Sequence, residues 1–493
     1  MAPTHTTSNM TTITYARIIK FMVPLAFTKL VVIFGNQALS RGLTSAENAT
    51  QALASFGIAF FICQFMVGIV FEFTNVSLVL VRSKRDGVVA LVCMLVVGVL
   101  IVATALLIAG LTAFGTFLTD TVYNLSQDVA LDVRKCMLYL AIWPLIEGLN
   151  WFLFGLLLSR EHSVFVGAAQ VLDIVVRVVF LFLLPMTSLL QTRPLLIPIL
   201  SMYTGMFLRV STALAGYVKY LHRTLERDTP VNARLTARQA YSFWLPLAIV
   251  NVCQNVSFPL TNLLVARDLA DTPEEAAKAI ATLSICYPTS MMTYHWLIDG
   301  RFLFPLYLDP SEEPVENDNR RNTVHHITRF NIGYFVISLT ICVILFWIPD
   351  VINNVLMTLL GLDKTIADMC IVPLRILTAI PITVSIRTHL TSWLMCIKRA
   401  EAVYPSAAVR LVFAVASVFV LPVLGMHGAP MGALSLVICF TLEMLAVVVA
   451  AAFINYWNKG RQSDLTPTSR YHPTEDELYN YCYTAVSGQE TRV

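Results

Sequence analysis

The most constraining feature of the chain is a series of apolar stretches, each about as long as a lipid bilayer is thick. A helix needs about 20 apolar residues to cross the roughly 30 Å hydrocarbon layer. Such windows lie near 17–39, 52–80, 87–109, 135–157, 164–185, 195–217, 241–264, 279–300, 328–348, 369–396, 402–423 and 430–456. Because 57% of the residues are hydrophobic and only 13% are charged, a water-soluble globule is excluded. The sequence predicts an all-α membrane protein with about twelve transmembrane helices.

Basic residues collect in alternate connections between these windows, and this predicts the orientation in the membrane. Cytoplasmic loops near the ends of spans carry an excess of Lys and Arg. One set of connections contains Arg17, Lys20, Arg82, Lys84, Arg85, Arg160, the run Lys219 to Arg238, Arg320, Arg321, Lys398, Arg399, Lys459 and Arg461. Both termini are therefore predicted to be cytoplasmic, with the plasma membrane as the expected location. The opposite loops carry sequons at Asn48 and Asn124, which predict glycosylation on the exterior.

The two halves of the chain resemble each other, which predicts the architecture. Pro24-Leu25-Ala26 recurs as Pro246-Leu247-Ala248, and Pro144 and Pro381 occupy corresponding fourth spans. Six spans per half is an even number, so both halves enter the membrane from the same side and form a parallel repeat. The predicted domains are an N-terminal tail (1–16), a six-helix lobe (17–218), a basic linker (219–240), a second six-helix lobe (241–457) and a C-terminal tail (458–493).

Charged residues in the tenth span suggest an anion pathway. A charged side chain at bilayer depth costs about 2.5 to 3.5 kcal/mol on insertion scales, so it usually faces a wet cavity or a partner. Arg375 and Arg387 are about 18 Å apart on a straight helix and differ by roughly 120° in direction, so one ligand contacts both only if Pro381 bends the helix. His389 shares the face of Arg375. The candidate substrate-binding residues are Arg387, the foremost, with Arg375, His389, Arg410 and Lys29.

The first half contributes a second set of candidates, for ion coupling or for lining a cavity. These are Glu147 and Asn150 in the fourth span and Asp173 and Arg177 in the fifth. Asp173 and Arg177 are four residues apart and share a helix face, so they form either a neutralised pair or part of a site. Glu147 has no local partner, and we expect it either to pair with Lys29 or to carry a proton.

Other polar residues in the spans have simpler expected roles. Arg209, Asp299 and Arg301 lie near the ends of spans, where long side chains reach the membrane interface. His295 and Glu443 are single polar residues on apolar helices, and we expect them to be satisfied internally rather than to act in a site.

Several classes of function are not expected. The sequence has no GxxxxGK[ST] loop and no soluble domain that could hydrolyse ATP, and its loops offer no nucleophile with a base. Enzyme activity is therefore not expected. The ten cysteines are scattered without a CxxC pair or a Cys/His cluster, so we expect no metal site and no cofactor. Nothing predicts a nucleic-acid partner. The chain ends in Thr491-Arg492-Val493, a form that PDZ domains bind, so a PDZ protein is a possible partner.

Five strings along the chain resemble the progressive ankylosis protein family. They are NVSLVLVRSKRD at 75–86, RPLLIPILSMYTGMFLR at 193–209, SFWLPLA at 242–248, CIVPLRI at 370–376 and HLTSWLM at 389–395. The resemblance runs from about Arg17 to Lys459. It implies export of inorganic pyrophosphate, ATP and other multivalent anions such as citrate, and with it restraint of mineral deposition. It also implies the two-lobed fold of multidrug and lipid-linked oligosaccharide exporters.

The resemblance extends to individual residues, with departures. Positions that match vertebrate members of the family are Arg375, Arg387, His389, Arg410, Asp173, Arg209 and Arg301. Ile33 and Asn36 stand where those members carry acidic residues, and Asn255 and Phe258 stand where they carry arginines. Lys29 replaces a polar neutral residue. These departures imply a change in substrate or coupling.

The leading hypothesis is an exporter of multivalent anions that works by alternating access, with the two lobes rocking about a central site. One alternative is a flippase of an amphipathic, lipid-linked anion, because the same fold supports that task. The other is a non-transporting regulator of ATP or pyrophosphate release. The expected partners are therefore small multivalent anions and membrane lipid.

Overall fold

The structure of the chain is a computed structural model that consists of helices throughout its described part. The described residues are 14–41, 49–110, 112–117, 127–187, 193, 195–225, 234–269, 271–308, 317–359 and 364–463. Ten helical segments of this part are long and apolar enough to cross a bilayer. The helices α1 (Tyr15–Arg41) and α12 (Pro273–Tyr294) stand at the other two predicted spans. The prediction of an all-α membrane protein is confirmed.

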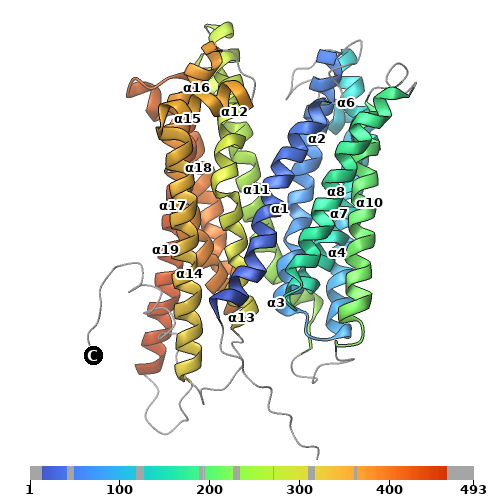
Figure 1. Cartoon of the computed structure of the whole chain (residues 1–493), viewed down its shortest axis with the longest axis vertical. Coiled ribbons are helices and arrows are strands. Elements are labelled where there is room, and N and C mark those ends of the chain that lie inside the picture. The colour runs from blue at the N-terminus through green and yellow to red at the C-terminus, as the bar shows by residue number, and fades with distance from the viewer. Residues whose placement is uncertain are drawn as a thin grey trace, which may run out of the picture.

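Two bundles of helices lie side by side (Figure 1). The first lobe contains α1, α2 (Ala49–Phe71), α3 (Phe73–Leu80), α4 (Lys84–Ala109), α5 (Ala113–Thr116), α6 (Gln127–Leu140), α7 (Trp143–Leu158), α8 (Ser163–Leu183), η2 (Leu184–Met186), α10 (Leu196–Gly216) and η3 (Tyr217–Leu221). The second lobe contains α11 (Ala237–Asp268), α12, η5 (His295–Phe302), α13 (Leu303–Tyr307), α14 (Asn317–Trp347), α15 (Pro349–Asn353), η7 (Asn354–Leu359), α16 (Lys364–Leu377), α17 (Ile380–Cys396), η8 (Ala400–Val403), α18 (Tyr404–Val423) and α19 (Gly428–Ser463).

The outer surface of the bundles is apolar, as a lipid environment requires. Phe182, Phe207 and Val423 are 72%, 75% and 85% exposed. In water such exposure would leave large apolar patches, whereas lipid tails solvate them without cost. The charged side chains of the spans face inward instead, and the site is built from them.

The parallel repeat is visible where the helices break. The fourth span divides into α6 and α7, and the tenth divides into α16 and α17. Pro144 and Pro381 lie in the first turns of α7 and α17, where a missing backbone N–H costs no helical hydrogen bond. The predicted disturbance at Pro381 is therefore an interruption of the helix between Leu377 and Ile380.

The turns after α7 and α17 repeat the same backbone geometry. Glu161 and Lys398 both have a left-handed conformation, with φ of 61° and 59°. Each N–H donates to a carbonyl three residues back, Leu158 O at 2.9 Å and Met395 O at 3.0 Å. The separation between these two residues equals that between Pro144 and Pro381. A left-handed residue other than glycine costs about 1 kcal/mol, so its recurrence at matching positions supports the repeat independently of sequence.

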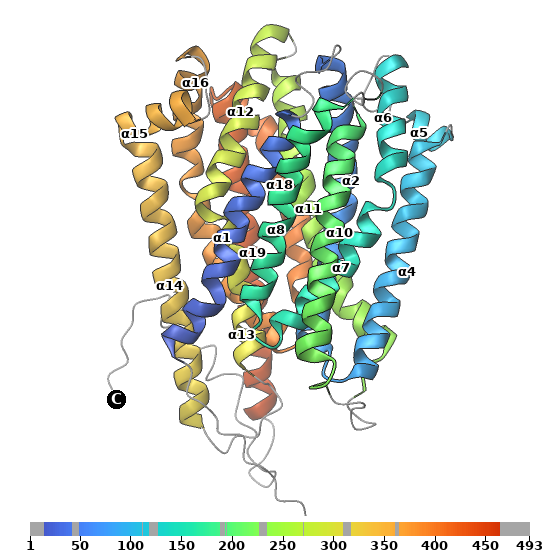
Figure 2. The same cartoon turned by 45° about the vertical axis from the view of Figure 1, so that its right-hand side comes forward.

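The lobes meet toward one end of the molecule, the lower end in Figures 1 and 2, where α1 begins and α3 and α13 lie. Arg17 lies in the first turn of α1, and Arg82 lies between α3 and α4. We call this end the basic end. Several contacts join the lobes there. The Trp244 indole N–H donates to Ile69 O at 3.0 Å and its ring stacks on Phe73, the Leu235 N–H donates to the Asp86 carboxylate at 3.0 Å, and Tyr241 donates to Cys93 O at 3.3 Å. In Figure 1 the ribbons of the lobes diverge from this end toward the other.

The close contact between α3 and α7 depends on a glycine, which gives a first prediction. A Cβ atom at Gly155 would lie 1.9 Å from Ser77 Oγ and 2.3 Å from Thr74 O. Gly155→Ala is therefore expected to destabilise the protein by about 1–3 kcal/mol through overpacking. Thermal unfolding of the purified protein measures this. Gly333→Ala is the matched control, because nothing lies within 4 Å of a Cβ there. It should leave the unfolding temperature unchanged or raise it.

Candidate functional site

The second lobe contains a buried cluster of two arginines and one carboxylate, which we call the arginine cluster (Arg387, Arg410, Glu443). Arg387 Nη1 donates to Glu443 Oε1 at 2.8 Å, and Arg410 Nη1 donates to Glu443 Oε2 at 2.5 Å. The three side chains come from α17, α18 and α19. Burying such charges is costly unless they are paired and hydrogen-bonded, and the carboxylate accepts from both arginines. The helices therefore converge on a single acidic group.

Neighbouring groups fix the arginine cluster in place. Arg410 Nε and Nη2 donate to Ser257 Oγ at 3.0 and 2.7 Å, and Gln254 Nε2 donates to Glu443 Oε1 at 2.6 Å. The Arg410 guanidinium lies 4.1 Å from the centre of the Phe440 ring. Two cations share one carboxylate, so the three residues together carry one positive charge. Arg387 remains 7% exposed whereas Arg410 is 1% exposed, so Arg387 is the more accessible of the two.

The first lobe contains a matching cluster, the carboxylate cluster (Glu147, Asp173, Arg177, Arg209). Arg209 bonds to Glu147 and lies 3.1 Å from Asp173 Oδ2. Arg177 binds both oxygens of Asp173 at 2.6 and 2.8 Å. Two carboxylates and two guanidiniums leave this cluster with no net charge. A glycine on α10 makes room for it, because a Cβ at Gly205 would lie 2.2 Å from Asp173 Oδ1.

The two clusters are related by the repeat, with their charges inverted. In the first lobe, Arg209 on α10 forms ion pairs with Glu147 of α7 and Asp173 of α8. In the second lobe, Glu443 on α19 forms ion pairs with Arg387 of α17 and Arg410 of α18. These helices belong to the fourth, fifth and sixth membrane spans of each lobe. Equivalent helices therefore contribute opposite charges to the two clusters, and of the two only the arginine cluster has a surplus of positive charge.

A third group of charges joins the lobes, and we call it the interlobe latch (Lys29–Asp299 and Glu72–Arg301). Lys29 Nζ lies 3.5 Å from Asp299 Oδ1, and Arg301 Nη1 lies 3.2 Å from Glu72 Oε1. Glu72, at the break between α2 and α3, also accepts from Asn251 Nδ2 of α11 at 2.8 Å. Asp299 Oδ2 and Arg301 Nε and Nη2 are buried and have no hydrogen bond within the described part of the chain. The latch is thus only partly satisfied.

The structure corrects several expectations from the sequence. Glu147 does not pair with Lys29, because Arg209 reaches it within the same lobe and Lys29 turns to Asp299. Arg209, Asp299 and Arg301 do not extend to the membrane interface, because each is held in an ion pair inside the protein. Glu443 is satisfied internally, as expected, but by two arginines, so it is the centre of the arginine cluster and not a single polar residue. A comparison of the charged residues on the fourth, fifth and sixth spans of the two halves could have suggested the ion pairs of Glu147 and Glu443.

The other candidates of the tenth span lie on a different side of the lobe. Arg375 Nε donates to Phe346 O at 3.4 Å and its guanidinium lies over the Trp347 ring at 5.5 Å. His389 Nδ1 is 2.9 Å from Asn331 Nδ2. Phe346, Trp347 and Asn331 all belong to α14, so Arg375 and His389 share a face, as the helical spacing predicted. The structure therefore separates both from Arg387 and the arginine cluster.

Asn150 and His295 are among the buried polar side chains of the described spans that have atoms without a hydrogen-bond partner. Asn150 is fully buried, and neither its amide oxygen nor its amide nitrogen has a hydrogen bond within the described residues. His295, which the sequence suggested is satisfied internally, has a buried Nδ1 without a described partner. Buried amides are normally hydrogen-bonded, often to water. Asn150 is one turn from Glu147, so it extends the polar interior around the carboxylate cluster.

Lys29 and Asn255, two of the positions that depart from the resemblance, are connected to the interlobe latch. Asn255 Nδ2 donates to Asn251 Oδ1 at 2.7 Å, which connects it to the latch residue Glu72. Phe258 stacks on Tyr287 with 4.5 Å between the ring centres. The predicted sites at Asn48, Asn124, Thr491 and Val493, and the side chains of Ile33 and Asn36, lie outside the described residues.

Comparison with known proteins places this geometry in a family. The family described as progressive ankylosis protein (ANKH) matches residues 7–348, more than half of the chain. The chain belongs to the progressive ankylosis protein family. The suggestion made by the five sequence strings is confirmed.

The fold of this family member is that of MATE transporters and other members of the MOP superfamily. The eukaryotic MATE transporter AtDTX14 aligns with a TM-score of 0.69 at 13% identity, covering 95% of this chain and 98% of that one. A MOP superfamily transporter from Pyrococcus furiosus, whose binding pocket is described as having reverse polarity, aligns with a TM-score of 0.66 at 15% identity and covers 92% and 96%. The Vibrio cholerae MATE transporter VcmN gives 0.66 at 12% identity, with coverage of 90% and 97%. The predicted two-lobed exporter fold is confirmed.

Proposed function

We propose that this membrane transporter exports multivalent anions, with inorganic pyrophosphate, ATP and citrate as the candidate substrates, and that it thereby restrains mineral deposition. The observation that carries the proposal is the arginine cluster. Arg387 and Arg410 share the single carboxylate of Glu443, which leaves a buried positive charge. Guanidinium groups bind phosphate and carboxylate oxygens through two parallel hydrogen bonds, so this charge suits an anionic ligand.

Transport would proceed by alternating access, in which the two lobes rock against each other. The basic end corresponds to the cytoplasmic side by the excess of Lys and Arg there, so both termini would be cytoplasmic at the plasma membrane. The contacts between the lobes at this end, including the latch, make the structure closed toward the cytoplasm. Opening that side requires the Lys29–Asp299 and Glu72–Arg301 pairs to separate.

Export of an anion needs no ATP hydrolysis. With the cell interior negative, each exported negative charge gains about 2.3 kcal/mol per 100 mV, so a trivalent anion gains roughly 7 kcal/mol. The gain for a trivalent anion exceeds the free energy needed to move a solute against a hundredfold concentration gradient, which is about 2.8 kcal/mol. A facilitator is therefore sufficient for outward flux.

Reconstitution of the purified full-length protein tests the proposal. Proteoliposomes loaded with pyrophosphate, ATP or citrate should release at least one of these anions faster than protein-free vesicles. Imposing a membrane potential that is negative on the loaded side should accelerate release. Uncharged solutes of similar size provide the control. Release that is indifferent to both charge and potential would contradict the proposal.

The same vesicles separate the two alternatives. A flippase of a lipid-linked anion would translocate fluorescent anionic lipids while the soluble anions stay inside. A regulator of ATP or pyrophosphate release would produce neither activity in vesicles, although cells expressing it would still release more of these anions. The arginine cluster favours transport over regulation, because a buried, partly neutralised charge is costly to maintain without a ligand.

The latch gives a prediction about the balance of conformations. Replacing Glu72 by Gln and Asp299 by Asn removes both ion pairs between the lobes, and we expect the population open at the basic end to rise about 10- to 100-fold. Spin labels on Arg85→Cys and Arg399→Cys, both exposed and one on each lobe, would report this as a longer distance. Asp132→Asn is the control, because its partner Lys135 lies on the same helix. An unchanged distance distribution would show that the latch does not hold the lobes.

A further inference from the structure

A cavity lies between the lobes at the basic end, distinct from the charged clusters inside the lobes. Its volume is about 260 Å³. We call it the seam cavity, and its lining consists of Leu78, Val79, Val81, Arg82, Ser159, Arg160, Pro305, Leu306, Leu308, Cys396 and Lys398. Drug-sized ligands occupy pockets of about 300–1,000 Å³, so this cavity suits a smaller molecule. Three of the lining residues are basic and none of those described is acidic.

The walls of the seam cavity come from equivalent parts of the two repeats. The first lobe supplies the end of α3 and the turn between α7 and α8, and the second lobe supplies α13 and the turn after α17. The cavity therefore lies at the seam where the repeats meet. When the lobes separate at the basic end, the two walls must move apart. A ligand held by both walls would bind only while this end is closed.

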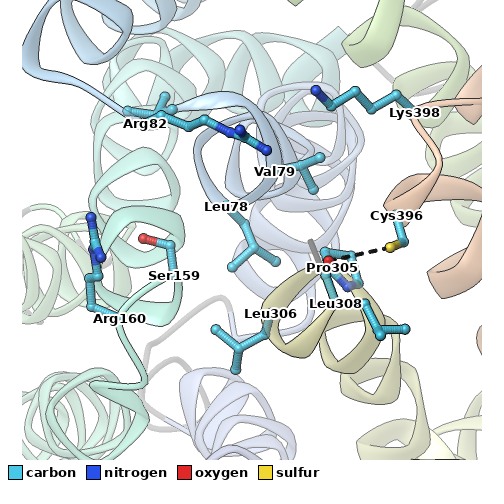
Figure 3. A pocket seen from close by; sticks show the side chains of 11 residues that line it. Leu78, Val79, Arg82, Ser159, Arg160, Pro305, Leu306, Leu308, Cys396 and Lys398 are labelled. Carbon is cyan, nitrogen blue, oxygen red and sulfur yellow. Dashed lines mark hydrogen bonds between the residues drawn. The ribbon is translucent and has the colours of Figure 1, made fainter. Parts of the chain in front are cut away.

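The basic side chains are arranged around the cavity from both lobes. In Figure 3, Arg82 of the first lobe and Lys398 of the second extend toward one another, and Arg160 lies beside Ser159 on the first-lobe wall. Lys398 has a φ of 59° and is held by hydrogen bonds in its turn. A lysine adopts this backbone conformation less readily than a glycine does. The turn thus fixes the backbone position from which the Lys398 side chain extends.

From this arrangement we propose that the seam cavity binds a multivalent phosphate anion. Two guanidiniums and an ammonium supply donors of the kind that bind phosphate oxygens, while Leu78 and Leu306 give the cavity an apolar floor. An anion between the walls would be attracted by basic side chains of both lobes. The phosphate comes either from a soluble polyphosphate of the cytoplasm or from the headgroup of a phosphorylated lipid.

Occupancy of the seam cavity would hold the basic end closed. A ligand shifts a conformational equilibrium toward the state that it binds better, and only the closed state brings both walls to the anion. The anion at this site is therefore a regulator of the lobe movement, separate from the arginine cluster. The proposal does not depend on which substrate the protein carries, or on whether it carries one.

Binding to the full-length protein in nanodiscs tests the site. All measurements use the Arg387→Gln background, so that the arginine cluster does not contribute its surplus charge. One arm adds inorganic triphosphate to neutral nanodiscs and measures its affinity by calorimetry. The other arm compares nanodiscs with and without phosphatidylinositol 4,5-bisphosphate. The seam variants are Arg160→Gln and Lys398→Asn, the latter chosen because asparagine tolerates a left-handed backbone. Arg399→Gln, which removes a charge from the same turn outside the cavity, is the matched control.

The expected result is binding that weakens about tenfold or more in each seam variant and is unchanged in the control. Hydrogen exchange at residues 159–162 and 397–400 should slow when the anion is added, in walls of both lobes. Triphosphate binding with this dependence identifies a soluble ligand, and the same dependence with the lipid alone identifies a headgroup. Either supports the proposal. No binding in either arm, or binding that is equal in the seam variants and the control, overturns it. Thermal unfolding verifies that every variant is folded.

Discussion

Replacing Arg387 by glutamine should abolish most anion efflux while leaving the protein folded. Removal of this arginine leaves Glu443 paired with Arg410 and hydrogen-bonded to Gln254, so no buried charge loses its last partner. What disappears is the surplus positive charge and the more accessible guanidinium of the pair. A charge-assisted hydrogen bond contributes about 1.5–3 kcal/mol, which corresponds to a fall of roughly 10- to 100-fold in the rate at low substrate concentration.

Efflux from cells that express each variant, together with flux from proteoliposomes, measures this effect. Arg375→Gln is the matched control, since it changes the same residue type in the same predicted span. Arg375 lies over Trp347 and against Phe346 O, on the side of α14. Its loss should therefore change efflux by less than about twofold. Equal loss of efflux in both variants would mean that efflux depends on the charge of the span in general and not on the arginine cluster.

Replacing Glu443 by glutamine should have the largest effect on stability. The carboxylate is fully buried and is the acidic group shared by Arg387 and Arg410. The substitution keeps the size and shape of the side chain but leaves two buried cations close together without a counter-charge. Breaking a buried ion pair from one side costs about 3–5 kcal/mol. We expect a large fall in the thermal unfolding temperature and little protein at the cell surface.

A second substitution distinguishes this explanation from general damage to α19. In Glu443→Gln with Arg410→Met, one of the two unpaired cations is removed, and the methionine still packs against Phe440. Stability should rise relative to Glu443→Gln alone, although Arg410→Met by itself destabilises the protein. The double-mutant cycle measures this coupling, which typically lies between 0.5 and 3 kcal/mol for contacting residues. Additive losses would show that Glu443 and Arg410 do not act as a pair.

The spans, the repeat and the face of each candidate on its helix could be predicted from the sequence. Spans follow from apolar length, because the bilayer fixes how many residues a helix needs. Helical periodicity predicted that His389 lies on the face of Arg375 and that Arg387 does not, and the contacts of the first two with α14 agree. Asp173 and Arg177 pair at a spacing of four residues for the same reason.

Partners from different helices could not be predicted in this way. The expectation that Glu147 reaches Lys29 was wrong, and Arg209, Asp299 and Arg301 form ion pairs inside the protein although their positions near span ends suggested exposure. The length of a span does not say which helices pack together or how deeply a residue is enclosed. Packing in three dimensions decides both.

The sequence by itself determined that the chain is a two-lobed bundle of membrane helices with arginines in its interior, because hydrophobic length, charge asymmetry and internal repetition are properties of the linear order. Only the tertiary structure decided which charges meet. It brought Arg387 and Arg410 to one glutamate on α19, and it placed opposite charges at the corresponding helices of the other lobe. The physical reason is that Coulomb energy in a low-dielectric interior depends on separation in space. Residues 33 to 62 positions apart in the sequence become neighbours only when the helices pack.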